Sequence, residues 1–67
     1  MEYYGRREKS VRIIKALLEK GATKRQMILA LLENGGLSRK WVFQYLEDLG
    51  ELIKEKEGVY SWNKKND

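Results

Sequence analysis

The chain contains neither cysteine nor histidine, so no disulfide and no Cys/His zinc site can hold its fold together. This constraint is severe because the chain has only 67 residues. A domain of that size buries only about 60% of the surface that its unfolded form exposes. Such domains usually rely on a disulfide, a metal or a partner subunit. We therefore expect a single domain that is stabilised by well-packed helices or by self-association.

The same composition argues against catalysis. Without cysteine and histidine, the chain lacks the usual thiol nucleophile and the usual general base. The neighbouring acids Glu47 and Asp48 would lie about 100° apart on a helix, which suits neither a metal nor an acid–base pair. The sequence also lacks a phosphate-binding glycine loop. We expect no enzyme, no catalytic or metal site, no cofactor and no small-molecule effector.

The net charge of +4 is concentrated near the N-terminus. Residues 1–25 carry eight basic and three acidic side chains, residues 26–50 carry two and three, and residues 51–67 carry four of each. A basic lobe attracts polyanions, of which nucleic acid comes first and acidic membrane second. The longest apolar run, Met27 to Leu32, has six residues, against the ~20 that span a bilayer. With no signal peptide evident, we expect a cytoplasmic protein without membrane contact.

Two segments in the first half of the chain have a helical pattern. The first is predicted to run from about Glu8 to Lys20, with Ser10 as a possible cap or with an earlier start, and to end at Gly21. Its apolar stripe consists of Val11, Ile14, Leu17 and Leu18. The second is predicted to open at Thr23, which forms a capping box with Gln26, and to end at residues 34–36. Its expected core residues are Ile28, Leu31 and Leu32, with Met27 and Leu29 on the flanks.

A third helix and a hairpin complete the prediction. Ser38 is the expected N-cap and Gly50 the expected stop of the third helix. Its apolar stripe consists of Val42, Tyr45, Leu46 and Leu49. Residues 52–56 and 59–62 flank Glu57-Gly58 and predict a β-hairpin, with Tyr60 and Trp62 on one face. The expected fold class is α+β and mostly α. It comprises a core over about residues 9–62, a basic and aromatic arm at 1–7 and a polar tail at 63–67.

The segment GLSRKWVFQYLEDLGELI, residues 36–53, resembles the recognition-helix segment of winged helix-turn-helix transcription regulators. Shared features are Leu-Ser, a polar pair, a buried Val, a buried Leu, a Gly near the helix end and Leu-Ile at the start of the wing. The turn EGVY, residues 57–60, resembles the wing of that family. The resemblance spans roughly Lys9 to Trp62. It implies a winged helix, three helices followed by a C-terminal wing, that binds double-stranded DNA as a small regulator from an archaeon, a plasmid or a virus.

The resemblance also implies which residues contact DNA. In this family the N-terminal half of the third helix enters the major groove, and the matching residues here are Ser38, Arg39, Lys40, Phe43 and Gln44. Gln44 pairs with adenine, Lys40 with guanine or a phosphate, and Phe43 with a thymine methyl in this prediction. Phosphate contacts are expected from the start of the second helix at Thr23, Lys24 and Arg25. Further contacts are expected from the wing at Lys54 and Lys56, and from the arm at Arg6, Arg7 and Lys9.

Other interpretations stay open from sequence alone. With Val42 at the centre of the buried stripe, Lys40, Gln44 and Glu47 point outward, but outward polar residues are often only solvated. Trp41 and Phe43 suit a protein-interaction adaptor of the same fold if they form an exposed pair. RNA binding through the same surface is a third alternative. Tyr45, Tyr60 and Trp62 are expected in the core. Tyr3 and Tyr4 predict a homodimer, because they have no obvious partner within one chain.

Overall fold

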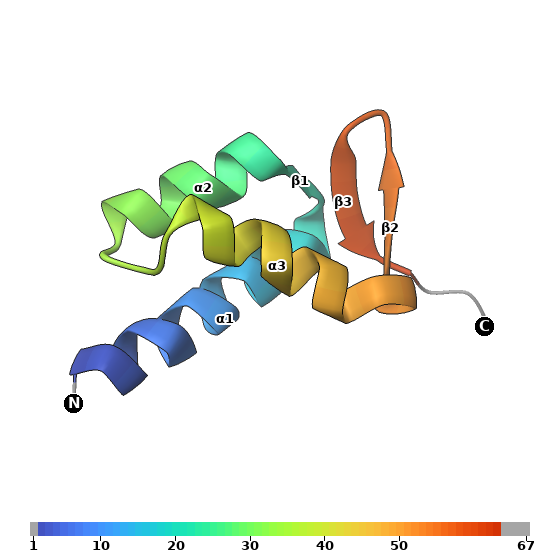
Figure 1. The fold of residues 1–67 in the computed structure, drawn as a ribbon. Coiled ribbons are helices and arrows are strands. Elements are labelled where there is room, and N and C mark those ends of the chain that lie inside the picture. The colour runs from blue at the N-terminus through green and yellow to red at the C-terminus, as the bar shows by residue number, and fades with distance from the viewer. Residues whose placement is uncertain (1, 64–67) are drawn as a thin grey trace.

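The computed structural model describes the backbone of residues 2–63 and the side chains of residues 5–63. It is a mostly helical α+β domain with a C-terminal hairpin, which confirms the predicted class (Figure 1). The elements in chain order are α1 (Glu2–Lys20), β1 (Ala22–Thr23), α2 (Lys24–Glu33), α3 (Arg39–Leu49), a 3-10 turn (Gly50–Leu52), β2 (Ile53–Lys56) and β3 (Val59–Trp62).

The hairpin belongs to a three-stranded antiparallel sheet of order β1-β3-β2. β2 and β3 pair as predicted, with Lys56 opposite Val59. The two turn residues, Glu57 and Gly58, both have positive φ, at 54° and 84°, as a two-residue hairpin turn of the type I′ kind requires. β1, which the sequence did not predict, pairs Ala22 with Tyr60. The sheet therefore ties the chain between α1 and α2 to the hairpin.

The core lies where the three helices meet the sheet. Its buried apolar residues are Ile14, Leu18, Ala22, Met27, Leu31, Val42 and Leu46. The predicted stripes of α1 and α3 are confirmed, since their other members are half-buried, most of them against this cluster. Tyr45, Tyr60 and Trp62 also pack against it, half-buried. These aromatic rings cover the core rather than fill it.

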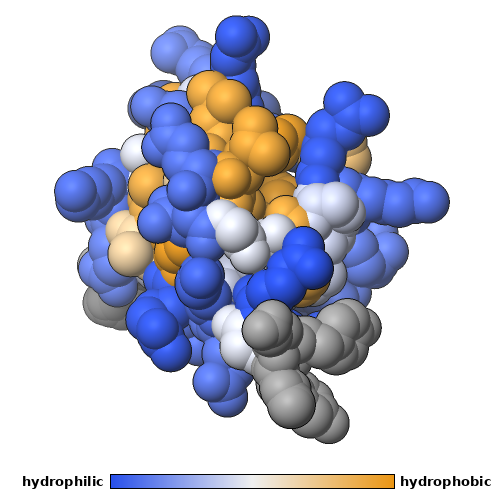
Figure 2. Space-filling model, turned by 90° about the vertical axis from the view of Figure 1, so that its left-hand side faces the viewer, coloured by the Kyte–Doolittle hydropathy of each residue, from blue (hydrophilic) through white to orange (hydrophobic). Residues whose placement is uncertain are grey.

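The prediction for the buried side of α2 was right for Leu31 and for Ile28, which packs against the core, but wrong for Leu32 and for Met27, which was expected only on the flank. Met27 and Leu31 are buried, whereas Leu32 is 74% exposed. Met27 and Leu31 are four residues apart and lie on one side of the helix, while Leu32 is turned about 100° from Leu31. Together with half-buried Ile28, Leu32 lines a groove of ≈ 490 Å³ at the α2–α3 turn. Figure 2 shows that end of the molecule, where apolar side chains gather among hydrophilic ones.

The first helix begins at Glu2, not near Glu8, so residues 2–7 are helical and do not form an arm. The chain has no proline, and nothing in this stretch forces a break. The side chains of Tyr3 and Tyr4, expected at a dimer contact, lie outside the described part, as do residues 64–67 of the predicted tail. Arg6 and Arg7 thus project from a helix.

Ser10 bonds in the interior of α1 instead of capping it. Its hydroxyl donates to the Arg6 carbonyl at 2.7 Å and accepts from the Leu37 N–H at 2.8 Å, and the side chain is fully buried. A Cβ at Gly36 would lie 2.7 Å from this hydroxyl, so only glycine permits the contact. Ser10 therefore anchors the loop before α3 to α1.

The helix caps follow the sequence in part. The Gln26 N–H donates to the Thr23 hydroxyl at 3.1 Å, and the Thr23 N–H donates to the Gln26 amide oxygen at 2.9 Å, which confirms the capping box. Ser38 holds the N-cap position of α3, but within the described residues its side chain makes no capping bond. Among the described residues, every helix is too short or too polar to cross a membrane.

We expect Ser10→Ala to lower the free energy of unfolding by about 1–3 kcal/mol, because the Leu37 N–H loses its partner. Denaturant unfolding followed by circular dichroism measures this change. Ser38→Ala is the matched control and should change stability by less than about 0.5 kcal/mol, since its hydroxyl makes no capping bond in the described structure. Equal losses in the two variants would contradict an anchoring role for Ser10.

Candidate nucleic-acid interface

The outer face of α3 is an exposed and largely polar helix surface beside the hairpin. Val42 and Leu46 point into the core, which turns the opposite side to solvent. The exposed residues of this face are Arg39, Lys40, Phe43, Gln44, Glu47 and Asp48. Basic residues occupy the first turn and acidic residues the last. The outward orientation of Lys40, Gln44 and Glu47 agrees with the helical-wheel prediction.

Lys24 joins three elements at one edge of this face. Its Nζ lies 4.8 Å from the ring centroid of Phe43 and 5.6 Å from that of Tyr60. Both distances are within the range of cation–π attraction. The first residue of α2 therefore sits between α3 and β3, where the sequence alone had predicted only a phosphate contact. No sequence signal reveals this meeting, because the three residues are far apart in the chain.

The charges at the starts of α2 and α3 oppose the helix dipole. Lys24 and Arg25 begin α2, and Arg39 and Lys40 begin α3, and neither first turn contains an acidic residue. Neither last turn contains a basic one. The stabilising arrangement is the reverse, at about 0.3–1 kcal/mol per charge. Free N–H groups and cations at the same helix ends create positive potential that attracts anions.

Gln44 is held in place on the outer face. Its Nε2 donates to Asp48 Oδ1 at 3.1 Å, one turn further along α3. In this orientation the Nε2 side of the amide faces the end of the helix. The amide oxygen and the second N–H are left to a partner outside the helix.

Trp41 and Phe43 lie on opposite flanks of α3 and form no exposed pair. Trp41 is half-buried and stacks on Tyr45, with ring centroids 4.8 Å apart and planes 11° apart. Phe43 is 43% exposed on the side of Lys24. Residues two apart on a helix differ by about 200° in direction. The single aromatic surface that an adaptor of this kind needs is therefore not formed by these two side chains.

The wing lysines face away from α3. Lys54 pairs with Ser61, and Lys56 pairs with Val59, so both lysines lie on the sheet face opposite Tyr60. Lys54 lines a hollow with residues at the end of α1. The structure thus does not bring the wing lysines together with the outer face of α3. Alternation along β2 sends Glu55, not a lysine, to the side of Tyr60.

Two of the three cations predicted in the arm support the loop before α3. Arg6 donates from its guanidinium to the Gly36 carbonyl at 3.2 Å, and Lys9 donates from Nζ to the Asn34 carbonyl at 3.0 Å. These bonds hold carbonyls that follow the end of α2. The arginine and lysine are fixed at that end of the molecule rather than in a free arm.

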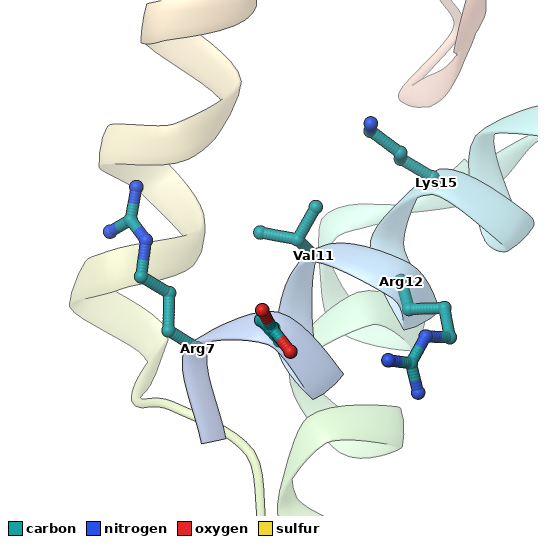
Figure 3. Close-up of a pocket in the computed structure, with 5 residues that line it drawn as sticks. Arg7, Val11, Arg12 and Lys15 are labelled. Carbon is teal, nitrogen blue, oxygen red and sulfur yellow. The ribbon is translucent and has the colours of Figure 1, made fainter. Parts of the chain in front are cut away.

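Arg7, the third of these cations, lines a separate groove beside α3. Figure 3 shows it reaching along α3, with Val11 and Lys15 following on the same side of α1 and Arg12 turned away. Burial raises the pKa of Tyr45 above its ordinary value of 10.0, and the positive charge of Arg7 opposes this rise. Arg7 therefore favours the charged form of the Tyr45 phenol, while burial disfavours it.

No group of three or more His, Cys, Asp or Glu side chains that would hold a metal occurs in the described part of the chain. Comparisons with protein-family models, with curated proteins and with solved structures find no match to this chain.

We expect Arg7→Gln to raise the pKa of Tyr45 further, because it removes the charge that stabilises tyrosinate. A pH titration of the Tyr45 ring carbon signal by NMR measures this. Because the folded-state pKa is raised, the contribution of Tyr45 to stability is complete below about pH 10 and declines as the pH rises through the folded value. Arg12→Gln, whose side chain points away from α3, is the control and should leave the pKa unchanged. A fall after Arg7→Gln would contradict the assignment.

Proposed function

We propose that the chain is a winged-helix domain that binds double-stranded DNA with the outer face of α3 in the major groove. One observation carries the proposal. Four exposed cations, at the first turns of α2 and α3, are placed against the helix dipoles that they adjoin. This placement destabilises the free protein, and the loss of stability is offset when phosphates neutralise the charges.

The layout of the domain supports the same function. A capped α2, a glycine-containing turn and an exposed α3 are followed by a hairpin beside α3, which is the arrangement that helix-turn-helix docking uses. In that docking, Lys40 and Gln44 face base edges, while Arg25 and Arg39 lie near the backbone. A single module of this kind buries about 600–1,000 Å² on DNA. A second copy would double that footprint on a two-fold related site.

The wing takes a smaller role in this proposal than the family resemblance implies. Lys54 and Lys56 lie on the sheet face away from α3, and Glu55 is on the near side. Lys24 supplies the cation that bridges α3 and the sheet. We therefore assign the backbone contact at this edge to the start of α2.

The test is the salt dependence of binding to a labelled duplex of random sequence, followed by fluorescence anisotropy. A triple variant removes three cations of the proposed interface: Arg25→Gln, Arg39→Gln and Lys40→Gln. A control triple variant with the same net charge removes three cations of α1: Arg12→Gln, Lys15→Gln and Lys20→Gln. We expect the first variant to reduce the slope of log affinity against log salt by about 0.9 for each phosphate that it no longer neutralises.

The control variant should keep the slope of the original chain apart from a small general charge effect. Equal reductions in both variants would show that net charge alone drives binding and would remove the assigned face. Tighter binding to a double-stranded RNA of the same sequence would replace DNA by RNA as the ligand. Absence of binding to either duplex at low salt would overturn the proposal.

Base reading by α3 is tested on a selected DNA site with the double variant Lys40→Ala, Gln44→Ala. Both side chains are exposed, so we expect the fold to remain intact. Affinity for the selected site should fall by about 1–3 kcal/mol for each base that is no longer read, while affinity for random DNA changes less. Unchanged preference for the selected site would remove α3 as the reader.

A further inference from the structure

Phe43 is the one large apolar side chain on the exposed face of α3 within the described residues, and it is 43% exposed. Its ring lies beside the Lys24 ammonium, 4.8 Å from centroid to Nζ. The Tyr60 ring also lies near that ammonium, at 5.6 Å. A cation attracted to two rings has less conformational freedom than a free lysine. An apolar surface and a positioned positive charge are thus presented together.

With α3 in the major groove, as proposed above, this pair matches one feature of DNA. Thymine is the base that presents an apolar group there, its C5 methyl, and aromatic contact with that methyl is a known mode of reading. Every thymine is flanked by phosphates of its own strand. We propose that Phe43 and Lys24 together recognise thymine, Phe43 through the C5 methyl and Lys24 through a neighbouring phosphate of the same strand.

Gln44 extends the same recognition to a neighbouring base pair. Asp48 Oδ1 accepts from its Nε2, which leaves the amide oxygen and one N–H for the N6 and N7 groups of adenine. Gln44 follows Phe43 directly and points about 100° further round α3. The two side chains therefore address adjacent positions across the groove. The preferred ligand is duplex DNA with consecutive A·T pairs.

The experiment compares duplexes that differ only in the methyl group. One duplex contains only A·T pairs in mixed order, and its partner contains deoxyuridine in place of thymidine. A second pair contains only G·C pairs, with cytosine or with 5-methylcytosine, which carries a methyl at the same ring position. We expect about fourfold weaker binding to the uridine duplex for each methyl contacted. We expect a gain of similar size when cytosine is methylated.

Variants separate the methyl contact from the phosphate contacts. Phe43→Ala should bind the thymidine and uridine duplexes equally, with an unchanged salt slope, and Phe43→Gln should do the same if the alanine variant fails to fold. Leu32→Ala is the control, because Leu32 is an exposed apolar residue at the other end of α2. It should keep the full difference between the two duplexes.

The possible outcomes distinguish thymine recognition from DNA binding in general. Equal, salt-dependent binding of the original chain to the thymidine and uridine duplexes would overturn thymine recognition and leave DNA binding standing. If the difference in affinity between the thymidine and uridine duplexes persists after Phe43→Ala or Phe43→Gln, it arises from the duplex and not from Phe43. That result would also overturn the proposal. Failure to bind any duplex would overturn DNA binding itself, and thymine recognition with it.

Discussion

The buried hydroxyl of Ser10 is the contact on which the placement of α3 depends. It bonds along α1 to the Arg6 carbonyl and across to the Leu37 N–H, so it fixes the start of α3 against the first helix. Gly36 allows this approach because a side chain there would overlap the hydroxyl. Arg6 and Lys9 bond to carbonyls of the same loop. A chain without disulfides thus uses hydrogen bonds to hold the loop that aims α3.

The start of α2 combines a capping box that stabilises the helix with cations that destabilise it but suit the proposed function. The capping box of Thr23 and Gln26 satisfies free N–H groups at the start of α2 and stabilises the helix. The cations that follow, Lys24 and Arg25, oppose the dipole of the same helix. Rings of α3 and β3 flank one of these cations, which partly compensates its position. The combination is understandable if this surface receives an anion.

Sequence patterns predicted the features that depend on residues close together in the chain. The capping box, the stripes of α1 and α3 and the hairpin turn all follow from spacing within a few residues. Predictions that required knowledge of neighbours were wrong or incomplete. Leu32 was expected inside and is exposed, because Met27 takes the buried position on α2 beside Leu31. From sequence alone, a buried serine with two hydrogen-bond partners cannot be distinguished from a serine that caps a helix. Ser10 was therefore interpreted as a possible cap.

The sequence by itself determined the approximate positions of the three helices and the hairpin, which side of α3 is apolar and where the excess positive charge lies, because periodicity and composition are properties of the chain alone. The tertiary structure decided the composition of the surface beside α3. It placed Lys24 between Phe43 and Tyr60, turned Lys54 and Lys56 to the far side of the sheet and fixed Arg6 and Lys9 on the loop before α3. These placements depend on β1 pairing and on how α1 packs, and both join residues far apart in the chain.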